Sequence, residues 1–113
     1  MTEPDAALAA LAADFNGSCA FARPGPGADN YKVSLVVKAD AVVRDSARFS
    51  GGDNRIGTVA ANTMLTGEGP LVGGHSGGSG YGVVVRDSQG RVCRGYVSGA
   101  DVAPTKRARG RSM

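Results

Sequence analysis

Short stretches of alternating apolar and polar residues, separated by turn-forming residues, constrain this chain more than any other feature of its sequence. The clearest stretch begins at Tyr31, where apolar residues fall two apart and lysine or serine fills positions between them. A period of two is that of a β-strand with one buried face. We expect further short strands at residues 41–44, 55–60, 63–66, 82–86 and 91–97. Several short strands with frequent turns predict an all-β domain, either a small barrel or a sandwich.

The best-defined turn is the sequence Asp-Ser-Gln-Gly at residues 87–90. Valines precede it, Val92 follows it, and Gly90 is able to adopt the positive φ that such turns need. We therefore expect a β-hairpin at this point of the chain.

A length of 113 residues fits one domain, which we divide into three parts. Residues 1–30 are expected to form a short helix and a proline- and glycine-rich linker. Residues 31–103 are expected to form the β-domain, and residues 104–113 a basic tail.

The first of these parts carries helix signals. A capping threonine, an early proline and acidic residues predict a helix over residues 4–14. Leu8, Leu11 and Phe15 follow one another at helical spacing and form a narrow apolar stripe. Because so short a helix is not stable alone in water, the stripe must dock, either on this chain's own sheet or on a neighbouring subunit. In the second case it is an assembly arm.

Charge is unevenly distributed along the chain. The net charge is +3, and four cations lie among the last eight residues, which leaves the rest close to neutral. These cations are Lys106, Arg107, Arg109 and Arg111. The tail is expected to be solvated, or else to make a weak, salt-sensitive contact with nucleic acid or an acidic protein surface. Since no apolar run reaches about 18 residues, no membrane partner is expected.

The two cysteines, Cys19 and Cys93, lie far apart in sequence, and neither belongs to a C-x-x-C pair. This pattern favours two reduced, buried thiols, with a disulfide as the alternative. The N-terminus opens with acidic residues and alanines and carries no readable export signal. We therefore expect a cytoplasmic location in the producing cell, or incorporation into a virion.

Residues 74–78, Gly-His-Ser-Gly-Gly, formally match the G-x-S-x-G motif of serine hydrolases. Such chemistry needs a histidine within reach of the serine, oriented by a carboxylate, and a strand-turn-helix context. Here the only histidine adjoins the serine, and both flanks are rich in glycine. We therefore predict that the chain is not an enzyme. No phosphate loop or metal-ligand spacing is present, so no cofactor or metal is expected.

Residues 67–82 contain eight glycines. A segment of this composition has little to bury and a high conformational entropy when unfolded. We expect a mobile loop between two strands, with ordering on a partner as the alternative.

A series of short motifs occurs in order between residues 41 and 102. These are Val42-Val43-Arg44 before a long loop, Ile56-Gly57-Thr58-Val59, Gly80-Tyr81-Gly82-Val83, the turn 87–90, Gly95-Tyr96-Val97 and a final short turn at 98–102. Their order and spacing resemble those of bacterial SH3-like (SH3b) domains. The resemblance covers slightly over half of the chain.

This resemblance implies an SH3-like barrel, here with an added N-terminal helix and strand, that acts without catalysis as an interaction module. The candidate contact residues are Tyr81, Tyr96, Arg44, Arg48 and His75. The expected partners are other protein subunits, or further copies of this chain, in a larger assembly such as a phage particle. Recognition of a peptide or of peptidoglycan is the alternative.

Overall fold

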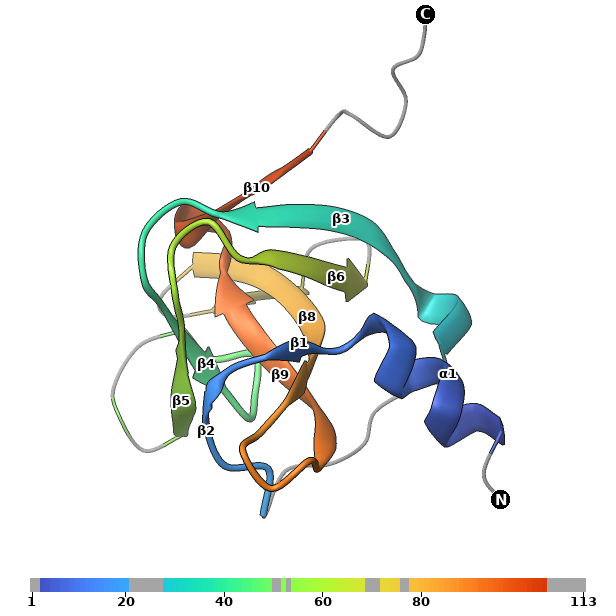
Figure 1. The fold of residues 1–113 in the computed structure, drawn as a ribbon. Helices are drawn as coiled ribbons and strands as arrows, with labels where there is room; N and C mark the ends of the chain where they lie inside the picture. Colours follow the sequence, from blue (N-terminus) through green and yellow to red (C-terminus); the bar gives the residue numbers. More distant parts are fainter. Residues whose placement is uncertain are drawn as a thin grey trace, which may run out of the picture.

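The computed structural model describes residues 3–20, 28–49, 52, 54–68, 72–75 and 78–105 (Figure 1). Its helical elements are α1 (Glu3–Leu11), η1 (Ala28–Asn30) and η2 (Gly99–Asp101). Its strands are β1 (Ala13–Asp14), β2 (Asn16–Gly17), β3 (Tyr31–Val37), β4 (Ala41–Arg44), β5 (Arg55–Val59), β6 (Met64–Glu68), β7 (Val72–His75), β8 (Gly78–Arg86), β9 (Val92–Ser98) and β10 (Val102–Pro104). The protein is all-β with little helix, as the alternating pattern predicts.

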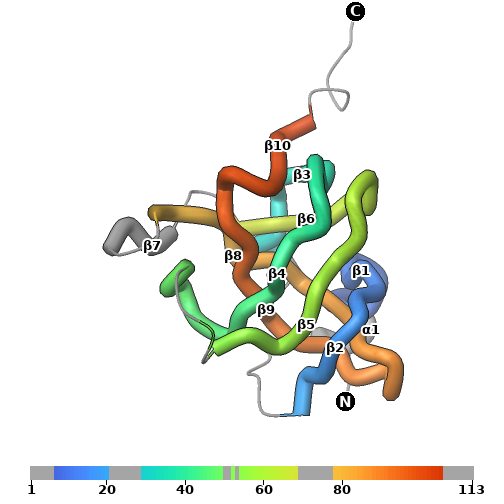
Figure 2. The backbone as a smooth tube through the Cα atoms, turned by 90° about the vertical axis from the view of Figure 1, so that its left-hand side faces the viewer, coloured from blue at the N-terminus to red at the C-terminus, as the bar shows by residue number. Residues whose placement is uncertain are grey.

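The strands form one strongly bent sheet. They pair in the order β10-β3-β6-β8-β9-β4-β5-β2, and both β1 and β7 pair with β8. Figure 2 shows β6 crossing β4 and β5 at a steep angle. The part of the sheet that contains β6 therefore faces the part that contains β4 and β5. All pairs are antiparallel except β1 with β8.

The main core lies between these parts of the sheet. Alternation is clear in β9, where residues 93, 95 and 97 are buried and their neighbours only half-buried. Strand β8 departs from it, because Val83, Val84 and Val85 are all fully buried. Val84 points away from the main core and packs in a second cluster with Leu8 of α1 and with Tyr31. The helix thus covers the outer face of β8.

Residues 13–17 form an extended segment that joins two strands of the sheet. Through β1 it pairs with β8, and through β2 with β5. The N–H of Phe15 also donates to the carbonyl of Arg86 at 3.0 Å. The helix predicted to reach residue 14 therefore ends at Leu11, and the segment after it belongs to the sheet. We call residues 13–20 the N-terminal strap.

Two glycines allow the strap to approach β5 closely. Gly17 and Gly57 are paired across the strands, and the Phe15 ring packs over them. A Cβ atom added at Gly57 would lie 2.7 Å from that ring. The Phe15 ring can therefore be buried at this place because Gly17 and Gly57 carry no side chains.

The strap ends at a disulfide between Cys19 and Cys93 of β9, with their Cα atoms 5.8 Å apart. The expectation of two reduced thiols was therefore wrong. Sequence spacing gave no sign of this pairing, because only the docking of the strap brings residues separated by 74 positions together.

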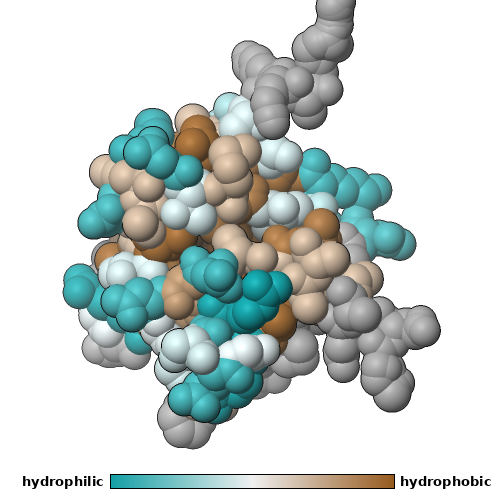
Figure 3. Space-filling model, viewed as in Figure 1, coloured by the Kyte–Doolittle hydropathy of each residue, from teal (hydrophilic) through white to brown (hydrophobic). Residues whose placement is uncertain are grey.

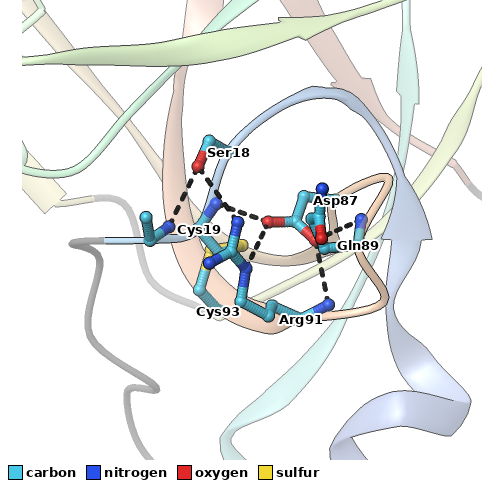
Figure 4. Close-up of polar contacts among 7 residues, drawn as sticks. Ser18, Cys19, Asp87, Gln89, Arg91 and Cys93 are labelled. Carbon is cyan, nitrogen blue, oxygen red and sulfur yellow. Dashed lines mark hydrogen bonds and ion pairs between the residues drawn. A yellow bond between two sulfur atoms is a disulfide. The ribbon is translucent and has the colours of Figure 1, made fainter.

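The carboxylate of Asp87 holds the same end of the strap (Figure 4). Its Oδ2 accepts from the backbone N–H of Cys19 at 2.8 Å and from Nε of Arg91 at 3.0 Å. Its Oδ1 accepts from the backbone N–H groups of Gln89 and Arg91, both at 2.9 Å. These bonds, led by that from Cys19, lower the pKa of Asp87 to about 2.

The hairpin turn predicted at residues 87–90 is confirmed, with Gly90 at a φ of +83°. The short turn expected near residue 98 is η2, where Ser98 accepts from the N–H of Ala100. By contrast, the glycine-rich stretch 67–82 is not simply a loop: β7 lies within it, and β8 begins at Gly78. Of the basic tail expected at residues 104–113, Pro104 belongs to β10 and the N–H of Thr105 donates to the carbonyl of Ser34, whereas residues 106–113 lie outside the described residues.

The helices within the described residues lack the length and the apolar character that a membrane-spanning helix requires.

Candidate interaction surface

One row of residues crosses the outer face of the sheet, the face that points away from the main core. Tyr96 on β9 is the Cα partner of Arg44 on β4 and of Gly82 on β8. Tyr31 on β3 is the partner of Glu68 on β6. A Cβ atom added at Gly82 would lie 3.1 Å from Cδ of Glu68, which places these two residues side by side. We call these five residues the Tyr96 row.

Tyr31 reaches this face because the strand register shifts between it and Val33. Val33, Leu35 and Val37 pack against the main core, whereas Tyr31 packs in the second cluster under α1. A β-bulge of this kind reverses which face a side chain occupies. The bulge thereby places the Tyr31 hydroxyl near Glu68 instead of in the core.

Arg94 joins the row from the next outward-facing position of β9. Its Nε donates to Oε2 of Glu68 at 2.7 Å, and its Nη2 donates to Oε1 at 3.1 Å. The guanidinium carbon also lies 5.0 Å from the centroid of the Tyr96 ring. A two-bond fork to a carboxylate and a stacked aromatic ring fix the guanidinium in position. The missing side chain of Gly82 provides the space for this arrangement.

Both tyrosines of the row have raised pKa values. Burial, followed by the negative charge of Glu68, raises the pKa of Tyr31 to about 12. Burial also raises the pKa of Tyr96. Both hydroxyls therefore stay protonated at neutral pH. The Tyr31 hydroxyl is buried and has no hydrogen-bond partner among the residues that the structure describes.

Arg44 is a buried member of the row. Its Nη1 donates to Oδ1 of Asn54 at 2.8 Å, and Nδ2 of Asn54 donates to Oγ of Ser46 and to the carbonyl of Arg48. Arg44 and Asn54 therefore hold together described residues of the segment between β4 and β5. Arg48 itself is exposed at the edge of this network.

Two of the candidate contact residues, Tyr81 and Tyr96, do not share one face of the sheet. The Cα partner of Tyr81 is Val97, and the Tyr81 ring packs against the main core. Because neighbouring positions of a strand point to opposite faces, Tyr81 and Tyr96 lie on opposite sides of the sheet. His75 pairs with Gly78 in the hairpin of β7 and β8, and its side chain lies outside the described part of the chain.

The stripe predicted from helical spacing packs on this chain's own sheet. Leu8 and Phe15 are buried and Leu11 is half-buried. Within the structure described, Leu8 and Phe15 are therefore covered and are not presented to a neighbour.

The rest of the surface that the described residues form is mixed in character. Figure 3 shows hydrophilic and hydrophobic side chains interspersed over the face that it displays. Two shallow hollows of about 500 and 440 Å³ flank Phe15, and Asp14 borders both. Within the described ranges, no three His, Cys, Asp or Glu side chains are grouped closely enough to hold a metal ion.

Sequence reasoning identified Tyr96 and Arg44 but missed Tyr31, Glu68 and Arg94. Alternation alone was sufficient to place Arg94 beside Tyr96, since they are two positions apart on one strand. Tyr31 and Glu68 can be placed in the row only from the pairing of β3 with β6 and from the bulge. No local sequence pattern indicates either feature.

No protein-family model, curated protein or solved structure matches this chain.

Proposed function

We propose that this chain is a non-catalytic interaction module that docks to other protein subunits in a larger assembly through the Tyr96 row. The arrangement of Tyr96, Arg94 and Glu68 carries this proposal. Tyrosine and arginine dominate the binding energy of many protein interfaces. Here both are held in fixed positions on paired strands, so little side-chain entropy is lost when a partner binds.

We further propose that the fold is an SH3-like barrel. In the strand order β8-β9-β4-β5 the two ends are β8 and β5, and the strap pairs with both of them. The turn at 87–90 and η2 also lie where the resemblance to SH3b domains expects a distal hairpin and a final one-turn helix. Both observations support a ring of strands completed by the strap.

The disulfide supports an oxidising location for the finished protein. Structural disulfides persist on virion and cell surfaces and are rare in the reducing cytosol. A phage particle remains our preferred assembly. The same observation favours a second candidate function, recognition of cell-wall peptide outside the cell.

A random-peptide library selected against the immobilised oxidised protein tests the main proposal. We expect peptides whose affinity falls by about thirtyfold in Tyr96→Ala, the loss typical of truncating a central interface residue. The control is Thr58→Ala, an exposed position on β5 outside the row. Circular dichroism and thiol titration would show that both variants keep the fold and the disulfide. A library that enriches nothing, or only peptides indifferent to Tyr96→Ala, would reject this surface.

A sedimentation assay with purified peptidoglycan tests the second candidate. Retention of the wild type and loss of retention in Tyr96→Ala would support wall recognition through the row. A protein that stays in the supernatant would exclude it.

A further inference from the structure

We propose that residues 3–20, which comprise α1 and the strap, are exchanged between two copies of this chain, so that those of each copy dock on the sheet of the other. The Cys19–Cys93 disulfide then joins the two copies covalently. This inference rests on the proposed assembly function, and it identifies the partner as a second copy of the chain.

The strap is bound by strands that lie far from it in sequence. β1 pairs with β8, and β2 pairs with β5. The N–H of Phe15 donates to the carbonyl of Arg86 at 3.0 Å. The N–H of Ser18 donates to the carbonyl of Ile56, also at 3.0 Å. These bonds are the same whether the strap and the sheet belong to one chain or to two, so the strap of a second copy fits this sheet in the same register.

The contacts of α1 and of Asp14 are transferable in the same way. Leu8 packs against Val84 of β8. The guanidinium group of Arg86 donates to the carbonyl of Ala9 through Nη2 at 2.6 Å and to Oδ1 of Asp14 through Nη1 at 3.0 Å. Arg86 thus holds the helix and the strap together on β8. Val84 and Arg86 lie outside residues 3–20, so a second copy supplies both partners.

The edges of β5 and β8 that the strap covers are selective for its sequence. The occupant needs a glycine at the position of Gly17, because a Cβ atom there would collide with the carbonyl of Ile56. Two residues earlier, the main core takes up the ring of Phe15. Two residues later, Cys93 bonds to a cysteine of the strap. These conditions favour a copy of the strap over an unrelated strand.

A sheet from which the strap has separated presents unpaired edges on β5 and β8. Such edges readily accept a strand of another chain. Residues 3–20 are joined to the rest of their own chain through residues 21–27 and the disulfide. Before the disulfide forms, the choice between the chain's own strap and that of a neighbour depends on how close the neighbouring copies lie. The close packing of copies in an assembly therefore favours exchange.

The disulfide makes the exchange permanent. Docking places the N–H of Cys19 on Oδ2 of Asp87, beside Cys93 (Figure 4). Bond formation oxidises the two thiols, while a small-molecule disulfide accepts two electrons and two protons and leaves as two thiols. In the last step the thiolate of Cys19 displaces one of these thiols from a mixed disulfide on Cys93. An exchanged dimer contains two such bonds between its chains.

Isotope mixing tests the exchange. Equal amounts of ¹⁵N-labelled and unlabelled full-length protein are reduced in urea, mixed, and refolded with oxidised glutathione at two protein concentrations that differ about tenfold. We expect a disulfide-linked dimer whose proteolytic peptides include labelled Cys19 bonded to unlabelled Cys93, detected by mass spectrometry. Because exchange is bimolecular, the ratio of this dimer to monomer should rise about tenfold with concentration. Monomer alone at both concentrations, or dimers without mixed-label Cys19–Cys93 peptides, would overturn the proposal.

Gly57→Ala distinguishes strap docking from random pairing of thiols. The added Cβ atom would lie 2.7 Å from the Phe15 ring, whereas at the control Gly52→Ala the nearest atom, Nε of Arg55, is 3.8 Å away. We expect the mixed-label dimer to be lost in Gly57→Ala and kept in Gly52→Ala. Phe15→Ala alters the strap instead of the sheet and should also lower the dimer yield. A mixed-label dimer as abundant in Gly57→Ala and Phe15→Ala as in the wild type would show that the thiols pair without docking, and would contradict the exchange.

The failure of this inference is distinguishable from that of the proposed docking surface. Library peptides that depend on Tyr96, together with monomer alone in the mixing experiment, would reject the exchange and leave the docking surface intact. Mixed-label dimers, together with a library that enriches nothing, would support the exchange and reject the docking surface.

Discussion

At the scale of single residues, Asp87 connects pH to the stability of the strap. Its carboxylate accepts hydrogen bonds from the strap and from its own turn, and these lower its pKa from an ordinary value near 3.8 to about 2. The unfolded chain therefore takes up this proton at higher pH than the folded one does. The stabilisation is fully present above about pH 4 and is lost as the pH falls from about 4 through 2.

Asp87→Asn should accordingly lower the urea midpoint near neutral pH and have a much smaller effect near pH 2. Unfolding curves of wild type and variant across this range would measure the difference. Asp14→Asn is the matched control, because Asp14 forms an exposed ion pair with Arg86 and its substitution should change stability little. A pH-independent effect of Asp87→Asn would contradict the assigned role of the carboxylate.

At the scale of elements, the main question is what α1 does for the sheet. Leu8 is 6% exposed and packs against Val84 on the outer face of β8. Truncating a buried leucine removes its transfer free energy and leaves a cavity. We expect Leu8→Ala to lower the free energy of unfolding by roughly 2–3 kcal/mol, and Leu11→Ala, at a half-buried position, to lower it less.

Urea unfolding of both variants would test this interpretation of the helix. If both variants leave the free energy of unfolding almost unchanged, α1 is not docked on its own sheet in solution. That result would favour the hypothesis that α1 is an assembly arm. Light scattering of the same two variants would then show whether either changes the solution mass.

The limits of sequence reasoning are also clearest for elements. The strands that the period of two predicted are present, because each has one face on the core. The strap was missed because β1 and β2 are two residues long, too short for any period, and because Phe15 fits the helical stripe equally well. The row was found only in part, since Glu68 and Tyr31 reach it through strand pairing and a register shift. Local pattern predicts which residues face inward, whereas the pairing of distant strands decides which of them meet.

At the scale of the whole molecule, the disulfide joins the first part of the chain to the penultimate strand. It closes a loop spanning a sequence separation of 74 residues. In the chain-entropy model, a cross-link over a loop of this length restricts the unfolded ensemble by about 4 kcal/mol. Small domains bury a limited core, so a contribution of this size is a large share of their total stability.

We therefore expect Cys19→Ser with Cys93→Ser to lower the free energy of unfolding by about 4 kcal/mol, measured in urea against the oxidised wild type. Native-state hydrogen exchange would show where the loss acts. The strap amides of Phe15 and Ser18, which donate to β8 and β5, should lose protection first, and the β8–β9 hairpin last. Uniform loss of protection would indicate that strap and sheet unfold as one unit. Selective loss at the strap would show that the disulfide holds closed a segment that can otherwise separate from β5 and β8.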